Sequence, residues 1–135
     1  MGKAAGVRIV CKEDCGSSPK KLFLRDFNIA AAKVNLPFIK KSLTEDVMWH
    51  LFEPAGQKEI FGRDNVLQEY KNNLVIVPIE FVIDTIITHG YGGAVKGQIK
   101  SKDGKLYVFG DFYEFNSAKS VKIKSMTSYI VEIKN

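Results

Sequence analysis

The hydrophobic pattern of the chain changes from mainly helical spacing to strand periodicity after about residue 73, and this change limits the folds open to it. In the N-terminal half, apolar residues recur at helical spacing, as at Phe23, Phe27 and Ala30. Ile79 to Thr88 is nearly continuous in β-branched and aromatic residues, which is typical of a long, largely buried strand. Asp103-Gly104 is a hairpin signal between two later strands. Helices followed by an antiparallel meander predict an α+β fold.

Capping and turn residues predict three helices before the meander. Ser18 and Pro19 are typical of a helix start, because a hydroxyl can accept from a free amide and proline needs no amide partner in the first turn. Asn35 restarts a shorter helix, which we expect to end at Thr44-Glu45-Asp46, and Gly62 opens a third one. We expect the third helix over residues 63–73, a loop over 54–61, and strands over 47–53, 79–88, 94–100, 106–115 and 121–133.

These elements are expected to form one domain with one cavity. A length of 135 residues is enough for a single core. We expect an N-terminal arm or short edge strand over residues 1–16 and a single domain over residues 17–135. N-terminal helices packed in a strongly curved, mixed and mainly antiparallel sheet would leave a conical pocket, because a helix cannot fill a curved sheet to its mouth. Such a pocket is the natural place for function.

Charge and hydropathy argue against two classes of partner. The formal net charge is +5, but the lysines are interspersed with acidic residues, and no arginine-rich run or known nucleic-acid-binding module occurs. No apolar run reaches the roughly 18 residues of a membrane-spanning helix, and the first residues lack the apolar centre of a secretory signal. We therefore expect a cytoplasmic protein with no nucleic-acid or membrane partner.

The two cysteines, Cys11 and Cys15, do not form a metal-binding motif. A zinc site needs more ligands, and the nearest histidine is the distant His50. A disulfide is open to the pair if the chain turns between them, but a reducing cytoplasm favours two free thiols. We expect no metal and no cofactor.

Two carboxylates fall among apolar side chains. Glu53 ends the strand over residues 47–53 and shares a face with Trp49 and Leu51. Asp111 lies in the middle of an aromatic row that includes Phe109 and Tyr113. Burying an ionised carboxylate costs several kcal/mol of hydration, so Asp111 needs a partner or a raised pKa. The alternatives are that Glu53 is a solvated loop residue and that Asp111 faces solvent or a lysine.

Two acids in one apolar cavity can have pKa values that are pushed apart, so that one serves as a base and the other as a proton donor. This division suits the movement of a proton beside a carbonyl group. His50 lies on the opposite face of the strand from Glu53, which favours an interface or solvent, and His89 is expected in a loop. The candidate pocket walls, each of which could equally be ordinary core, are Phe27, Trp49, Leu51, Phe109, Tyr113 and Met126.

Three segments carry a resemblance to a known family: Trp49 to Gly62, Tyr107 to Phe115, and Ile123-Lys124-Ser125-Met126-Thr127-Ser128-Tyr129. In this order they resemble the nuclear transport factor 2-like superfamily, with its cystatin-like α+β cone, and within it the SnoaL-like and steroid delta-isomerase-like branch. The resemblance covers roughly residues 17–133 and leaves residues 1–15 outside.

The resemblance implies roles for three residues. Glu53, followed by Pro54, matches the general base of the isomerases, although that acid is typically Asp. Asp111 matches the protonated acid that donates a hydrogen bond to the developing oxyanion. Phe27 takes the place of the tyrosine that is the other donor, and its neighbour Asn28 is expected to face about 100° away on the helix.

Three functions stay open on this basis. The first is a cofactor-free isomerase, cyclase or dehydratase acting on a small apolar carbonyl compound. The second is a module of the same fold that binds a hydrophobic ligand without chemistry. The third is an accessory protein that dimerises through the open sheet face, as members of the superfamily commonly do, with His50, Phe52 and the strand near Phe81 at the interface.

Overall fold

The computed structural model describes residues 6–73, 75–117 and 121–134, and it has the α+β architecture that the sequence predicts. The helices and strands of the described residues are, in chain order, β1 (Arg8–Cys11), α1 (Pro19–Lys33), α2 (Leu36–Lys41), β2 (Leu43–Glu53), β3 (Gly56–Phe61), α3 (Arg63–Asn72), β4 (Pro78–His89), β5 (Gly92–Ser101), β6 (Leu106–Phe115) and β7 (Ile123–Ile133).

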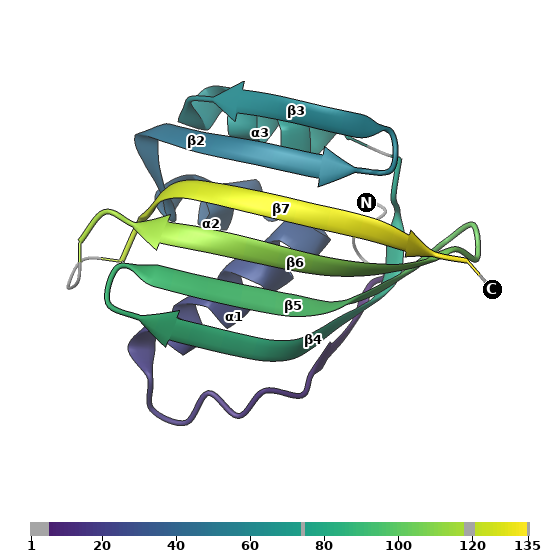
Figure 1. Ribbon diagram of the computed structural model, residues 1–135, viewed down its shortest axis with the longest axis horizontal. Coiled ribbons are helices and arrows are strands. Elements are labelled where there is room, and N and C mark those ends of the chain that lie inside the picture. The colour runs from purple at the N-terminus through teal and green to yellow at the C-terminus, as the bar shows by residue number, and fades with distance from the viewer. Residues whose placement is uncertain (1–5, 74, 118–120, 135) are drawn as a thin grey trace.

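All seven strands belong to one curled, open sheet in the order β1-β4-β5-β6-β7-β2-β3. The pairs β1–β4 and β2–β7 are parallel, and the remaining neighbours are antiparallel. The three helices lie on one face of the sheet, so that this face forms the interior of the molecule (Figure 1).

Helix α1 lies against the inner face of the sheet and forms the centre of the core. It begins at the predicted place, where the Ser18 hydroxyl accepts from the amide of Lys21. Leu24 and Phe27 are completely or almost completely buried. The alternation along β6 also agrees with the sequence, because Tyr107 and Phe115 are buried with the inward-facing row.

Two predicted boundaries are wrong. Thr44-Glu45-Asp46 does not close the second helix but belongs to β2, which begins at Leu43. These polar residues are more exposed than the buried Leu43 and Val47 that flank them, so the segment is a half-buried strand. The segment expected as a loop over residues 54–61 contains β3, which pairs with β2. Because β3 is an edge strand with only Ile60 buried, its sequence has no apolar alternation to reveal it.

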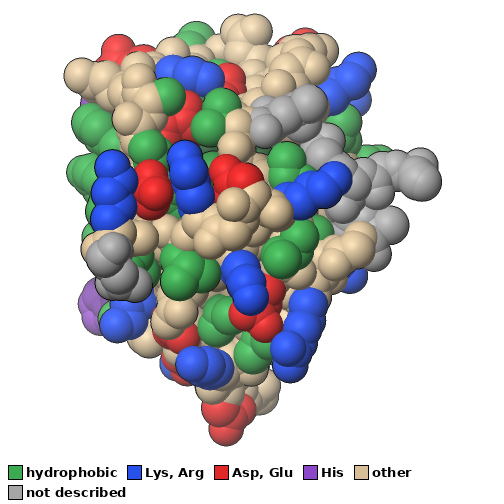
Figure 2. Space-filling model, turned by 90° about the vertical axis from the view of Figure 1, so that its right-hand side faces the viewer, with side chains coloured by type: hydrophobic (Ala, Val, Ile, Leu, Met, Phe, Trp, Pro, Cys, Tyr) green, Lys and Arg blue, Asp and Glu red, His purple; other side chains and the backbone are tan. Residues whose placement is uncertain are grey.

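One side of the surface carries mixed charge. Lysine and arginine side chains alternate with acidic ones over the side of the molecule that Figure 2 shows. None of the described helices has the length and apolar character needed to cross a membrane.

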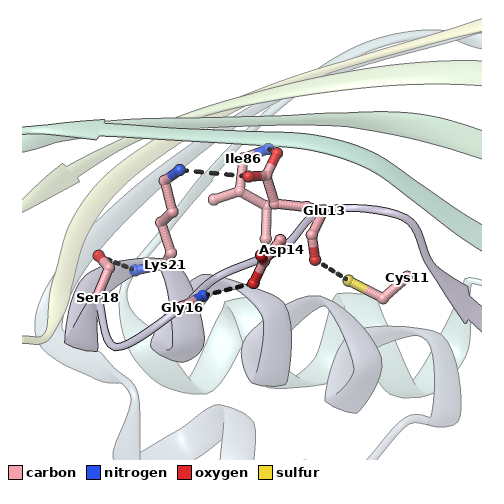
Figure 3. A network of polar contacts seen from close by, with 7 residues as sticks. All are labelled: Cys11, Glu13, Asp14, Gly16, Ser18, Lys21 and Ile86. Carbon is pink, nitrogen blue, oxygen red and sulfur yellow. Dashed lines mark hydrogen bonds and ion pairs between the residues drawn. The ribbon is translucent and has the colours of Figure 1, made fainter.

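The N-terminal arm continues beyond β1 along the same edge of β4 and is held there by hydrogen bonds. Beyond the end of β1, the Lys12 amide donates to the carbonyl of Ile83 at 2.8 Å. The Glu13 carboxylate then accepts from the amide of Ile86 at 3.0 Å and pairs with Lys21 at 3.2 Å (Figure 3). The hydrogen bond from Ile86 and the Lys21 ammonium hold the pKa of Glu13 below its usual range. Glu13 thus occupies the place that a further strand residue would take.

The cysteines of this arm are both free thiols. Cys11 is exposed and its thiol donates to the backbone carbonyl of Glu13, whereas Cys15 is buried at the approach to α1. Burial raises the pKa of the Cys15 thiol, which makes it a poor nucleophile at neutral pH.

Glu13→Ala should lower the free energy of unfolding by about 1–3 kcal/mol, because the Ile86 amide would lose its charged acceptor. Since folding lowers the pKa of Glu13, its contribution is present above the unfolded pKa and is lost as the pH falls through the folded one. Urea denaturation at pH 7 and at pH 3 measures both effects.

The control is Glu114→Ala, which removes an exposed carboxylate that pairs with Lys124 at 3.8 Å and accepts from the exposed Ser125 hydroxyl at 3.1 Å. Its effect should stay below about 0.5 kcal/mol at both pH values. Equal losses in the two variants would contradict the role given to Glu13.

Candidate functional site

A cavity lies between the helices and the inner face of the sheet. It encloses about 1070 Å³ of empty space, its open mouth included. Side chains from α1, α3 and five strands line it, together with the segment before β4 and Val7 of the N-terminal arm. The walls are mainly apolar and aromatic, which is the composition of a site for a flat organic molecule.

Both candidate carboxylates line this cavity. Leu51, Ser128 and Asp111 lie in register across β2, β7 and β6, and Glu53 is the next inward position along β2. The described lining also includes the other expected walls Phe27, Trp49, Leu51, Phe109 and Tyr113.

Met126 is an exception among the expected walls. It is buried in the core and is not among the described residues that line the cavity. Its register partners on the neighbouring strands are Trp49 and Tyr113, and the larger rings of these two residues take up the cavity surface at this level.

Asp111 is held in a hydrogen-bonded but poorly hydrated position. The Tyr113 hydroxyl donates to its Oδ2 atom at 3.2 Å, and Ser128 is its partner on β7. Burial raises the pKa of Asp111 to about 6, although hydrogen bonds from Ser128 and Tyr113 act in the opposite direction. A carboxyl group with this pKa is partly protonated near neutral pH and can then donate a hydrogen bond.

Glu53 is placed differently from Asp111. Its side chain is only 5% exposed, yet its Oε2 atom lies 3.6 Å from the Lys58 ammonium of β3. Asn73 donates to its Oε1 atom at 3.3 Å, and Lys58 also pairs with Glu69 at 2.8 Å. Glu53 therefore has a cationic and an amide partner, whereas the partners of Asp111 are neutral hydroxyl groups. The two acids therefore differ in environment, as a base and a donor would have to.

Asn28 corrects the sequence analysis. It was expected to face away, but it is 3% exposed and lines the cavity. Its Nδ2 atom donates to the Tyr113 hydroxyl at 3.1 Å and to the carbonyl of Leu24 at 2.8 Å. The curled sheet surrounds more than one face of α1. Asn28, the position next to Phe27, therefore also faces the interior.

Tyr70 of α3 is a lining residue that the sequence analysis did not place at the site. Its ring stacks on Trp49 with 4.6 Å between the centroids, and it lines the cavity. Burial and the nearby Asp111 charge raise the pKa of its hydroxyl well above the usual value. Across the described parts of the chain no group forms a hydrogen bond with this hydroxyl, so it is free to donate to a bound molecule. Helical spacing from the buried Val66 was the signal for its inward position.

Phe81 is a further lining residue. It is buried and stacks on Phe109 inside the cavity with 5.0 Å between the ring centroids. Gly97 makes this arrangement possible, since a Cβ atom there would lie 2.8 Å from the Phe109 ring and 1.9 Å from the carbonyl oxygen of Val82. The sequence analysis named the strand near Phe81 as a dimer surface, which stays a prediction.

The charged groups of the cavity lining are all acidic. Glu53, Glu69 and Asp111 line it, and no lysine, arginine or histidine does so among the described residues. Within residues 6–73, 75–117 and 121–134, no group of three or more histidine, cysteine or acidic side chains is arranged to hold a metal ion. The lining suits a neutral ligand better than an anionic one.

Solved structures identify the fold. A nuclear transport factor 2-like (NTF2-like) protein of unknown function from Burkholderia xenovorans LB400 is 19% identical, with a TM-score of 0.70 over 89% of this chain and 90% of that one. A "putative ketosteroid isomerase" from Kribbella flavida DSM 17836 is 17% identical, with a TM-score of 0.70 over 85% and 79%. An uncharacterised protein with a cystatin-like fold from Silicibacter pomeroyi DSS-3 is 22% identical, with a TM-score of 0.66 over 84% and 77%. No protein-family model and no curated protein matches the sequence.

Asp111 should titrate near pH 6, which the carboxyl ¹³C chemical shift measures, with Asp111→Asn assigning the signal. Because folding raises this pKa, the stabilising contribution is complete below about pH 4 and is lost as the pH rises through about 6. Asp111→Asn cannot ionise, so its stability relative to the wild type should improve by about 1–3 kcal/mol between pH 4 and pH 8. Titration near pH 4 would contradict the burial of this carboxyl group.

Proposed function

We propose that this chain, which has the NTF2-like, cystatin-like fold, binds a small, flat, apolar ketone and moves a proton at the carbon next to its carbonyl group. One observation carries the proposal: Glu53 and Asp111 line the same aromatic cavity in different environments. The comparison with the "putative ketosteroid isomerase" adds support at the level of the fold.

The proton transfer follows from these environments. The Glu53 carboxylate takes a proton from the α-carbon, and the electron pair of the broken C–H bond moves onto the carbonyl oxygen. The protonated form of Asp111 donates a hydrogen bond to this developing oxyanion, as does the free hydroxyl of Tyr70. Glu53 then returns its proton to the same or to a neighbouring carbon. The sequence of steps balances without an oxidant or a reductant.

Tyr70 can supply the oxyanion donor that Phe27 lacks. The resemblance to the isomerases places a donor at Phe27, which has none. Tyr113 cannot serve as this donor while its hydroxyl donates to Asp111, and it already accepts from Asn28. Tyr70 lines the same cavity, and among the described residues its hydroxyl makes no such hydrogen bonds.

The test uses 2-tetralone, a flat bicyclic ketone, in D₂O. The wild type should exchange the α-hydrogens for deuterium faster than buffer does, and ¹H NMR measures the rate. Glu53→Gln should reduce the rate to that of buffer, because an amide cannot accept the proton. Asp111→Asn and Tyr70→Phe should each slow it by about 10²-fold, as the loss of an oxyanion donor does.

Glu69→Gln is the matched control, because Glu69 lines the same cavity and shares Lys58 with Glu53. It should leave the exchange rate within a factor of about three of the wild type. If 2-tetralone binds to the wild type without accelerated exchange, the cavity is a binding site without chemistry. An equal loss in Glu53→Gln and Glu69→Gln would remove the specific role of Glu53.

We also propose that the chain forms a homodimer through the outer face of its sheet. Phe52, Phe112 and Tyr129 form an aromatic cluster there, in which the rings of Phe52 and Tyr129 stack with 4.9 Å between their centroids. Phe112 is 55% exposed and Tyr129 is 45% exposed. Exposed aromatic clusters of this kind are typical of protein–protein interfaces.

Phe112→Lys should convert the dimer to a monomer, because it would place two unpaired ammonium groups in the interface. Sedimentation-velocity ultracentrifugation between 1 and 100 μM measures the change. Val75→Lys is the control, since Val75 is 60% exposed and belongs to the segment between α3 and β4 rather than to a strand. A wild-type chain that remains monomeric over this range would contradict the proposal.

A further inference from the structure

Val34 has a backbone conformation that its residue type disfavours. At the C-terminal end of α1 it has φ 54° and ψ 46°, in the left-handed region. A β-branched side chain is rare there, because its Cβ atom crowds the neighbouring carbonyl groups. Among the described residues, Val34 is the only non-glycine residue with a positive φ.

At the other described positions with a positive φ the chain has glycine. Five described residues with positive φ are glycines, at positions 16, 56, 62, 90 and 104. At Val34 the helix ends in the usual glycine motif, with the amide of Val34 donating to Ala31 at 3.2 Å and the amide of Asn35 donating to Ala30 at 2.8 Å. The motif is therefore complete, and only the residue at its centre departs from the preference.

The side chain of Val34 gives a reason for the departure. It lines the cavity beside Ala31 and Ala32, which contribute only methyl groups to this part of the wall. Glycine at position 34 would relieve the backbone but leave the wall without its largest apolar group at this end of α1. Residues that are kept in strained conformations concentrate at functional sites.

We propose that Val34 is a specificity-determining residue, whose isopropyl group contacts the bound ketone and limits the size of the acyl group that fits. This inference rests on the proposed function, because it requires that the cavity bind such a molecule. The strain is retained because the contact with the ligand, rather than the end of the helix, needs a branched side chain.

The experiment compares Val34→Ala and Val34→Gly with the wild type, using two neutral fluorescent naphthyl ketones. These are 6-propionyl-2-(dimethylamino)naphthalene and its acetyl homologue, and the Kd of each is measured by fluorescence titration. Both variants should bind the propionyl ketone about 3–10-fold more weakly, because the contact of the two Cγ methyl groups is lost in each, and in glycine the Cβ atom is lost as well. The acetyl ketone should weaken more, so the ratio of the two affinities should shift at least about twofold toward the larger probe.

Thermal denaturation supplies the readout of strain. Val34→Gly should melt about 3–6 °C above Val34→Ala, since both lack the isopropyl group and only glycine relieves the backbone. Val82→Ala is the matched control, because Val82 is a half-buried valine outside the cavity lining. It should leave both Kd values unchanged.

The outcomes separate the two proposals. If neither ketone binds to the wild type, the proposed function and this inference both fail. If both ketones bind but the Val34 variants keep the wild-type affinities and their ratio, only the inference fails. A glycine variant that melts no higher than the alanine variant would also overturn it, because position 34 would then carry no strain to explain.

Discussion

The curl of one seven-stranded sheet around α1 is the constraint on which the other features depend. A single helix cannot fill a curved sheet, so an unfilled space remains between them, and the side chains that face it need not pack against one another. The same curl covers two adjacent positions of α1, Phe27 and Asn28, which a flat sheet would have placed on different sides. Burial of a carboxyl group at Asp111 becomes possible because the cavity wall supplies a phenol and a hydroxyl as partners.

Polar groups in an apolar cavity are costly, and this chain places them in two separate clusters. One joins Glu53 and Glu69 through a shared lysine and an asparagine, which keeps charge of both signs in contact. The other surrounds Asp111 with neutral donors, which leaves its ionisation governed mainly by burial. Glu53 and Asp111 lie on the same face of the sheet, and they differ in chemistry because their neighbouring groups differ. The local sequence around each acid does not assign the roles of base and donor.

Departures from local preference in this chain coincide with the cavity or with an edge of the sheet. Val34 keeps a left-handed backbone where it contributes to the cavity wall. Gly97 has no side chain, and this allows the Phe109 ring to lie against β5. Glu13 uses a side chain in place of backbone to satisfy an amide at the free edge of β4. In each case the surrounding tertiary structure stabilises a residue or conformation that local preference alone would disfavour.

The sequence by itself determined the α+β class, the start of α1, the strand over residues 106–115 and the shared face of Glu53 with Trp49, because periodicity and capping are local properties. It missed β3, since an exposed edge strand needs no apolar alternation, and it gave no sign that the ring of Phe81 stacks on a residue two strands away. Only the tertiary structure decided that Asn28 faces inward, that Met126 lies behind larger rings, and that Tyr70 brings a free hydroxyl to the cavity. These outcomes depend on how far the sheet curls and on which elements meet across it, and no single segment encodes that curvature.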